Sequence, residues 1–153
     1  GVYKLCSIEK DGVEYPKMKI SDNPDKVTNP ANKELWRFYD NKTGDALADL
    51  ITVHDEEIDT SKPYTLFDPL HTWKRKTVEN YSVRRLLEPV FIKGKCVYEP
   101  RDIEEIRVYH QKEMKTLWDS FKRFDFPQIY YVDLSQKLWD LRDRLLRENI
   151  AKI

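Results

Sequence analysis

Apolar and polar positions along the first hundred residues form short runs that are separated by turn residues. Runs rich in β-branched and aromatic side chains predict strands. Turn signals at Lys10–Gly12 and Asn41–Gly44 predict two hairpins, because Asn and Gly adopt the backbone conformations that tight turns need. A further turn is predicted at Lys93–Lys95, where the strand Val83–Phe91 leads into Cys96–Tyr98. The strands expected in this part of the chain are Val2–Ile8, Tyr15–Ile20, Glu34–Tyr39, Ala46–Val53, Tyr64–Phe67, Thr72–Val78, Val83–Phe91 and Cys96–Tyr98.

After Pro100 the apolar residues recur at steps of three and four, which predicts amphipathic helices. The first helix is expected to end before Pro127, and its apolar face would consist of Ile103, Ile106, His110, Met114, Leu117, Trp118 and Phe121. A second helix is expected to start at Asp133, whose carboxylate would cap the first turn while Gln136 reaches back. Its apolar face would consist of Leu134, Leu138, Leu141, Leu145 and Ile150.

This order of elements predicts an α+β fold, with mainly antiparallel strands in the first two-thirds of the chain and two amphipathic helices at the C-terminus. The length of 153 residues fits about one domain. The hydrophobic share is 40%, the charged share is 35% and the mean hydropathy is −0.75, so we expect a water-soluble chain with a small core. Aromatic residues make up 12% of the chain, which argues against disorder.

The charges of the chain balance, with 27 basic and 27 acidic residues. This balance disfavours a nucleic-acid binder or a polybasic membrane protein. No apolar run approaches the roughly 20 residues of a membrane helix, and no signal peptide is visible. We therefore expect a cytoplasmic protein that binds neither nucleic acid nor membrane. Cys6 and Cys96 are too few for a disulfide framework, and their apolar neighbours predict buried, inert thiols.

Few residues point to catalytic chemistry. Four glycines cannot assemble a Gly-rich phosphate loop, and two cysteines with three histidines give no zinc-ligand spacing. His54 lies in an acidic stretch that is typical of a solvated loop. His71 lies between apolar neighbours, where a partly buried, hydrogen-bonded imidazole is expected, and His110 lies on the apolar face of a helix, where core packing is expected.

A local basic patch consists of Lys74–Lys76 with Arg84 and Arg85. Such a patch is compatible with contacts to RNA phosphates, but the outer face of a sheet gives the same pattern. The neutral total charge of the chain favours the second interpretation, in which these basic residues lie on the solvent-exposed face of a sheet and do not bind RNA.

The segment from Lys19 to Lys33 has features that suit a phosphate ligand. Its prolines stiffen the backbone, so that ordering the loop on binding costs less entropy. Ammonium and hydroxyl groups are ordinary partners of phosphate oxygens. Solvated surface lysines give the same pattern, so the segment alone does not decide between the two. The candidate substrate-binding residues are Lys19, Ser21, Lys26, Thr28 and Lys33.

Two blocks of sequence are specific enough to be compared with known families, namely Met18–Pro30, which holds the lysine loop, and Tyr131–Leu138. Shorter matching stretches are Gly1–Leu5, Asp45–Ile51, Phe67–Leu70, Leu86–Phe91, Gly94–Lys95 and Ile103–Arg107. In this order, and along nearly the whole chain, they closely resemble the C-terminal part of the nicotinate phosphoribosyltransferase family.

The resemblance implies an enzyme that couples nicotinate to phosphoribosyl pyrophosphate and releases nicotinate mononucleotide and pyrophosphate. In the family, hydrolysis of ATP, with Mg, drives the reaction through a phosphorylated histidine, and the product enters NAD biosynthesis by the salvage route. Members are usually homodimers. An irregular α/β barrel carries the active site, and an N-terminal sandwich domain of the partner subunit closes it.

The resemblance also implies how the chain is organised. Residues 1–100 would be a strand-rich region that completes the non-barrel sandwich domain, and residues 101–153 a C-terminal helical region packed on it. In the family the barrel precedes this region, so the phosphorylated histidine and the residues that bind nicotinate would lie upstream. The partner of this chain would then be the missing N-terminal and barrel portion. We expect the chain alone to be inactive, to bind no cofactor by itself and to supply no catalytic residue.

In the related nicotinamide phosphoribosyltransferase, two lysines beside a similar loop hold substrate phosphates. Lys19 and Lys26 match them in order, with a separation that is one residue shorter. Pro30 and Ala31 stand where the family often has Pro-Gly, a difference that affects how closely the backbone can approach a ligand. Two alternatives remain open: a stand-alone interaction module without catalysis, and an RNA-binding domain that uses Lys74–Lys76.

Overall fold

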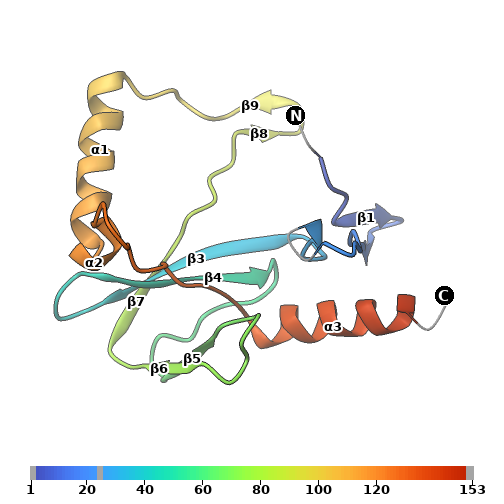
Figure 1. The fold of residues 1–153 in the computed structure, drawn as a ribbon. Coiled ribbons are helices and arrows are strands. Elements are labelled where there is room, and N and C mark those ends of the chain that lie inside the picture. Colours follow the sequence, from blue (N-terminus) through green and yellow to red (C-terminus); the bar gives the residue numbers. More distant parts are fainter. Residues whose placement is uncertain (1–2, 24–25, 151–153) are drawn as a thin grey trace.

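The computed structural model describes residues 3–23 and 26–150 of the chain. The strands are β1 (Ser7–Lys10), β2 (Val13–Pro16), β3 (Lys33–Asp40), β4 (Ala46–Val53), β5 (Tyr64–Phe67), β6 (Arg75–Val78), β7 (Tyr81–Arg85), β8 (Phe91–Ile92), β9 (Lys95–Cys96) and β10 (Val132–Leu134). The helices are α1 (Ile103–Thr116), α2 (Asp119–Lys122) and α3 (Gln136–Ile150). Apart from β10, strands precede helices (Figure 1), and the predicted α+β class is confirmed.

A four-stranded sheet in the order β10-β4-β3-β7 forms the centre of the fold (Figure 1). β3 and β4 form the hairpin predicted from the turn at Asn41–Gly44, and they pair antiparallel from Lys33↔Val53 to Tyr39↔Ala46. β7 pairs antiparallel with the other edge of β3, whereas β10 pairs parallel with β4. β4 therefore lies inside the sheet, and the burial of nearly all its residues explains its continuous apolar run.

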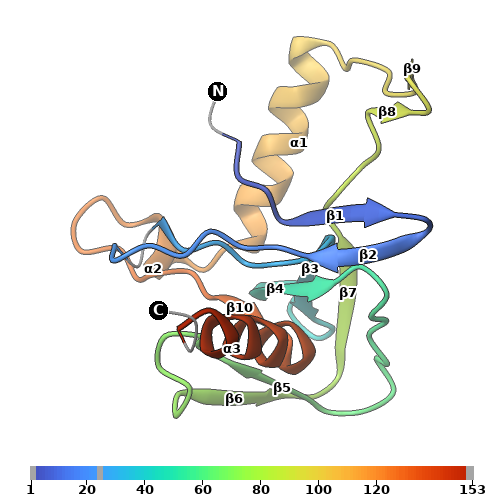
Figure 2. The same ribbon diagram turned by 90° about the vertical axis from the view of Figure 1, so that its right-hand side faces the viewer.

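Two groups of buried apolar side chains hold the elements together. In the larger group, Leu66 and Val78 of the β5–β6 hairpin pack against Trp36, Phe38, Leu47, Ala48, Leu50 and Tyr81 of the sheet. The ring nitrogen of Trp36 donates to Thr52 Oγ1 at 3.0 Å, so it does not remain unpaired in the core. The smaller group joins α3 to the sheet and consists of Ala31, Val53, Leu134 and Leu138. Figure 2 shows α3 and the β5–β6 hairpin lying on the same side of the molecule.

A cluster of charged side chains joins β3, β4, β7 and α1. Arg37 donates from Nε and Nη2 to the two carboxylate oxygens of Asp49, at 2.8 and 2.9 Å. Arg37 Nη1 also donates to Glu113 of α1 at 3.3 Å, and Arg84 donates to both oxygens of Glu113 at 2.9 and 2.6 Å. The hydrogen bond from Arg84 lowers the pKa of Glu113. Glu113 thus ties α1 to the sheet.

We expect Asp49→Asn to lower the free energy of unfolding by about 3 kcal/mol, because it leaves the largely buried guanidinium of Arg37 without its bidentate acceptor. Urea denaturation measures this change. Asp143→Asn is the matched control, since Asp143 pairs with Arg147 at the surface of α3, and losing a solvent-exposed pair destabilises a fold far less than losing a buried one. Equal effects of the two substitutions would contradict the prediction.

The first predicted strand is displaced toward the C-terminus. Residues 1–2 lie outside the described residues, and residues 3–6 are not in a strand. β1 begins at Ser7 and pairs only with β2, across the predicted turn at Asp11–Gly12. The carbonyl of Cys6 instead accepts hydrogen bonds from the N–H groups of Lys17 and Ala31, at 2.8 and 2.7 Å. The strand predicted for Val2–Ile8 is therefore wrong over residues 3–6, where the hydrogen-bond partners of Cys6 come from Lys17 and from the loop before β3.

Four further strands are shorter than predicted because their pairing ends. β6 covers Arg75–Val78 instead of Thr72–Val78, and β9 covers Lys95–Cys96 instead of Cys96–Tyr98. β2 stops at Pro16, which has no N–H to continue the ladder, so the strand predicted for Tyr15–Ile20 is wrong beyond that residue. β7 covers Tyr81–Arg85 instead of the predicted Val83–Phe91, since Arg85 is the last residue that lies opposite β3. The chain then forms a separate small hairpin from β8 and β9.

Ala31 adopts a left-handed backbone conformation, with a φ of 67°, where the loop enters β3. This conformation costs a residue that carries a Cβ about 1–2 kcal/mol, a cost that glycine does not have. The N–H of Ala31 bonds the Cys6 carbonyl and its side chain is buried, so the surroundings fix the conformation. The strained backbone gives a physical reason to prefer glycine at this position.

We expect Ala31→Gly to raise the free energy of unfolding by up to about 1 kcal/mol, because the strain relieved exceeds the extra freedom of glycine in the unfolded chain. Ala48→Gly, in the extended backbone of β4, should instead lower it by about 1 kcal/mol or more. Thermal unfolding followed by circular dichroism distinguishes the two. A loss of stability in both variants would refute the assignment of strain to Ala31.

α1 is the helix predicted after Pro100, but its apolar face is not covered. Asp102 caps it in a capping box. The helix does not continue to Phe121 as predicted: it ends at Thr116, whose hydroxyl bonds the Glu113 carbonyl, and α2 is a separate turn. None of the residues of α1 is buried. The predicted core position of His110 is therefore wrong, because the sequence period defines a face but not what covers it.

α3 begins later than predicted. Asp133 lies in β10, and Ser135 caps the helix by accepting a hydrogen bond from the Leu138 N–H at 3.2 Å. The Ser135 hydroxyl also donates to Glu56 at 2.6 Å, which joins the start of the helix to the loop after β4. The predicted cap at Asp133 is wrong because pairing with β4 draws that residue into the sheet.

Both cysteines are free, as predicted, but neither is buried. Cys6 is partly exposed beside β1, and Cys96 is exposed in β9. The hairpins β1–β2 and β8–β9 contribute no described residue to either group of buried side chains. The prediction of buried thiols fails because neither buried group of the described residues extends over these hairpins.

Candidate functional site

The lysine loop predicted to bind phosphate connects β2 to β3. Lys19 and Thr28 lie side by side at its base: the Lys19 N–H donates to Thr28 Oγ1 at 2.8 Å, and the Thr28 N–H donates to the Lys19 carbonyl at 3.3 Å. Ser21 Oγ accepts from the N–H of Asn23 at 3.3 Å, and the Asn23 carbonyl accepts from the N–H of Lys26 at 3.0 Å. Lys19 and Lys26 are exposed.

Lys33 differs from the other loop lysines because its ammonium group lies against the loop backbone. Its Nζ donates to the carbonyls of Asn29, Pro30 and Ala31, at 3.1, 3.4 and 2.5 Å. An ammonium group has three N–H donors, so these carbonyls account for all of them. The structure thus brings Lys19 and Thr28 together, places Ser21 and Lys26 in the same loop, and directs Lys33 inward at its end.

The histidines lie apart from the loop. His71 Nδ1 is 2.8 Å from Asp68 Oδ2, and its side chain is 45% exposed, which confirms the prediction of a partly buried, hydrogen-bonded imidazole. His54 is exposed in the acidic stretch, as predicted. The basic patch is divided, because Arg84 bonds Glu113 and Arg85 pairs with Glu57.

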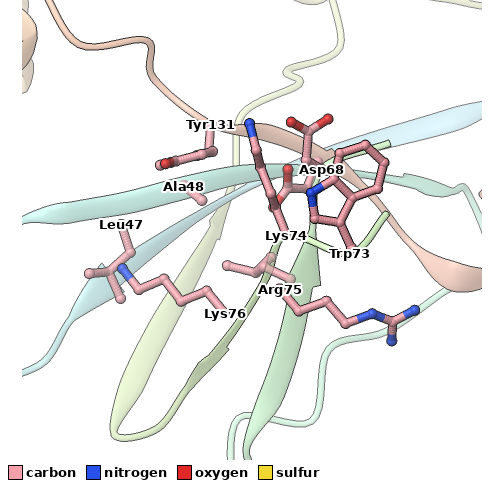
Figure 3. Close-up of a pocket in the computed structure, with 10 residues that line it drawn as sticks. Leu47, Ala48, Asp68, Trp73, Lys74, Arg75, Lys76 and Tyr131 are labelled. Carbon is pink, nitrogen blue, oxygen red and sulfur yellow. The ribbon is translucent and has the colours of Figure 1, made fainter. Parts of the chain in front are cut away.

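A second candidate site is a hollow of about 390 Å³ bounded by β4, the β5–β6 hairpin and the start of β10 (Figure 3). Its floor is apolar and consists of the buried side chains of Leu47, Ala48 and Leu66. The rest of the lining is polar or aromatic and consists of Asp68, Trp73, Lys74, Arg75, Lys76, Tyr131 and Asp133. A neighbouring hollow of about 790 Å³ shares Asp68, Lys74, Lys76, Tyr131 and Asp133, so the two meet at these residues.

Asp133 is the most unusual residue of this hollow. It lies opposite Leu50 in the parallel pair of β10 and β4, and it is only 4% exposed. Among the described residues its carboxyl group has no hydrogen-bond or ion-pair partner. Burial, and secondarily the charge of Asp68, raises the pKa of Asp133 to about 6. A buried carboxyl group without a partner is costly, and such groups gather at functional sites.

The basic residues of the hollow do not neutralise its acids. Asp68 accepts from the N–H groups of Leu70 and His71 and faces the His71 ring. Lys76 lies 5.4 Å from the centre of the Trp118 ring. Figure 3 shows Lys74 directed toward the side of the hollow where Asp68 and Tyr131 lie, and Arg75 extending away from it. In the part of the chain that the structure describes, no ion pair joins Lys74 or Lys76 to an acid.

This hollow does not appear in the sequence as a motif. Asp133 is predicted as a helix cap because a carboxylate before an apolar period is a cap signal. The sequence does contain the competing signal, since Ser135 is an equally good cap and stands directly before the first helical residue. If Ser135 is taken as the cap, Asp133 falls within the short apolar run Val132–Leu134. A carboxyl group in such a run is unusual and indicates a candidate functional residue.

No metal centre or membrane helix emerges from residues 3–23 and 26–150. They hold no group of three or more His, Cys, Asp or Glu side chains placed to bind a metal ion. No helix among them is long and apolar enough to cross a membrane.

We expect Asp133→Asn to stabilise the fold at pH 7 by roughly 3 kcal/mol, since a pKa difference of one corresponds to about 1.4 kcal/mol and the pKa rises from 3.8 to about 6. A raised pKa means that the folded state favours the neutral acid. The wild-type chain therefore loses stability relative to the variant as the pH rises from about 4 to about 6, and the difference levels off above that. Urea denaturation at several pH values tests this; a difference independent of pH would contradict it.

Comparison with known proteins places this α+β fold within a class of enzyme domains. A family model described as the nicotinate phosphoribosyltransferase C-terminal domain matches residues 32–142. The chain belongs to this family, which confirms the resemblance of the sequence blocks.

The relatives of the chain are longer proteins. It is 36% identical to a nicotinate phosphoribosyltransferase of Bacillus subtilis over 152 residues, which is 99% of this chain and 31% of that protein. It is 30% identical to the enzyme of the same name from Bos taurus, over 94% of this chain and 26% of that protein. The chain therefore spans less than a third of the length of these relatives.

A solved structure shares the fold. The crystal structure of human nicotinic acid phosphoribosyltransferase superimposes with a TM-score of 0.70 and 24% identity, covering 78% of this chain and 24% of that one. At this identity the likeness concerns the fold.

Proposed function

We propose that this chain is the C-terminal part of a nicotinate phosphoribosyltransferase, which forms nicotinate mononucleotide and pyrophosphate from nicotinate and phosphoribosyl pyrophosphate. The observation that carries the proposal is the 36% identity to the Bacillus subtilis enzyme along 99% of this chain. In this proposal the whole enzyme is cytoplasmic, uses ATP and Mg, and serves NAD biosynthesis by salvage. The described residues contain no metal-binding cluster, so we assign them no step that involves Mg.

The role proposed for the chain is to complete the enzyme structurally. Several large apolar side chains are at least 68% exposed, namely Phe91, Ile103, Phe124, Phe126 and Ile129. Soluble proteins seldom leave so many apolar groups uncovered, and such surfaces usually face a partner. We propose that the preceding barrel portion of the enzyme and a second subunit of a homodimer cover these apolar side chains.

The lysine loop is proposed to contact the phosphate groups of a substrate. The ammonium groups of Lys19 and Lys26 are solvent-exposed, and the paired hydrogen bonds between Lys19 and Thr28 set the shape of the loop base. The hydroxyl groups of Ser21 and Thr28 supply further donors. Lys33 is proposed to act in the same site by holding the loop backbone through its three carbonyl contacts.

A chimeric enzyme tests this function. We expect that replacing the matching C-terminal part of the Bacillus subtilis enzyme with this chain gives an enzyme that forms nicotinate mononucleotide, because the two are similar along the whole chain. The 153-residue chain alone and the truncated Bacillus enzyme should form none. Product formation is measured by chromatography, and light scattering reports whether the chimera is a dimer. A folded chimera without activity would contradict the proposal.

The same chimera tests the loop. Lys26→Ala should raise the KM for phosphoribosyl pyrophosphate or ATP by about tenfold, the effect expected from one charge-assisted hydrogen bond. Lys42→Ala is the matched control, because Lys42 is equally exposed but lies in the turn between β3 and β4. Unchanged KM values in Lys26→Ala would remove the loop from the proposal and leave the enzyme assignment in place.

A further inference from the structure

We propose that the hollow between β4, the β5–β6 hairpin and β10 binds a small zwitterion of the amino-acid type. The ammonium group of the ligand contacts Asp133, and its carboxylate contacts Lys74 and Lys76. Its apolar body lies on Leu47, Ala48 and Leu66. This site is independent of the lysine loop and of the reaction proposed above. Three features of the hollow support such a ligand: an unpaired acid, unpaired ammonium groups and an apolar floor.

The unpaired acid is Asp133. Asp133 is only 4% exposed. Nothing in the described part of the chain donates a hydrogen bond to its carboxyl group. Among the described residues, two polar side-chain atoms are fully enclosed and lack a partner, namely Tyr39 Oη and Arg142 Nε. The carboxylate oxygens of Asp133 are not fully enclosed in this way. They therefore remain reachable from the hollow that Asp133 lines. A ligand ammonium group would satisfy an acid that the fold leaves without a donor.

Asp68 adds a second negative charge on the same side of the hollow. Its oxygens are already occupied by the N–H groups of Leu70 and His71 and by the His71 ring. It therefore contributes electrostatic attraction for a cation without competing for the ligand's donors. The effect of its charge on the pKa of Asp133 indicates that the two acids lie close enough to interact.

The ammonium groups of Lys74 and Lys76 exclude a ligand that carries only positive charge. Both residues line the two connected hollows, and neither forms an ion pair with a described acid. A simple amine would be repelled by them, whereas a simple carboxylate would be repelled by Asp68 and Asp133. A molecule with one charge of each sign satisfies both ends, and this combination makes the site selective.

The floor and walls of the hollow determine which kind of ligand body fits into it. Leu47, Ala48 and Leu66 form the bottom of the hollow and are at most 9% exposed, so a ligand would contact only a small part of each. Trp73, which is 74% exposed, and Tyr131, which is 51% exposed, offer aromatic surface beside the floor. An apolar or aromatic side chain of an amino acid fits between them, and the volume of about 390 Å³ falls in the range of small-molecule sites.

Three probes with the same aromatic body test the proposal on the chimeric enzyme, in which this chain replaces the matching C-terminal part of the Bacillus subtilis enzyme. Phenylalanine carries both charges, phenethylamine only the ammonium group, and 3-phenylpropionate only the carboxylate. We expect phenylalanine to bind with a dissociation constant of about a millimolar, as suits a ligand of roughly a dozen heavy atoms. The other two should bind at least about tenfold more weakly. Calorimetry gives the affinities, and backbone amide NMR shifts should change at Lys74, Tyr131 and Asp133.

Variants assign each charge to its partner. Asp133→Asn should weaken phenylalanine binding by at least about tenfold and abolish its advantage over 3-phenylpropionate. Lys74→Met with Lys76→Met should abolish the advantage over phenethylamine. Asp55→Asn is the control, because Asp55 is exposed and pairs with Lys137; it should leave all affinities unchanged.

Two results would overturn the proposal. The first is the absence of saturable binding by phenylalanine and by leucine, which retains both charges on a smaller body. The second is binding that survives in Asp133→Asn or that shifts amides outside the hollow. Asp133→Asn is expected to fold, since it removes a buried charge, and circular dichroism of the variant checks this.

Discussion

The bidentate ion pair between Arg37 and Asp49 is the constraint on which most of the architecture depends. It crosses the two inner strands of the central sheet, where both side chains are at most 19% exposed. Because a charge in that position needs its partner, β3 and β4 are fixed in one register. Tyr130 also donates to Asp49, at 3.1 Å, and Arg37 reaches Glu113 of α1. Two distant segments of the chain are therefore positioned by one pair of residues.

The sequence predicts well those elements whose signals are local. The β3–β4 hairpin is correct because a Gly-containing turn joins β3, whose side chains alternate in burial, to β4, which is largely apolar and buried at nearly every position. α3 is correct in kind because Leu138 and its neighbours repeat with the helical period. The sequence does not predict β10: its three residues form a strand only because β4 offers them a parallel partner. The unburied face of α1 was missed for a related reason, since a period of apolar residues does not identify the surface that covers it.

The candidate sites divide in the same way. The lysine loop can be found from the sequence because its residues lie close together, although the inward direction of the Lys33 ammonium group depends on the folded loop. The hollow cannot be found in this way. Asp133 and Lys74 lie far apart in the sequence and meet only when β10 joins the sheet beside the β5–β6 hairpin. The division of the chain into residues 1–100 and 101–153 stays a prediction, while pairing of β10 with β4 links the two parts.

The parallel pairing of β10 with β4 has a consequence for biosynthesis. A ribosome releases β3, β4 and β7 long before it releases Val132, so the sheet must wait for its last strand while the rest of the chain is made. Throughout that interval β4, which is buried at nearly every position in the finished fold, has one edge unpaired and able to pair with another nascent chain. Chain elongation from β7 to β10 thus sets the time during which this protein is most exposed to aggregation and to chaperones.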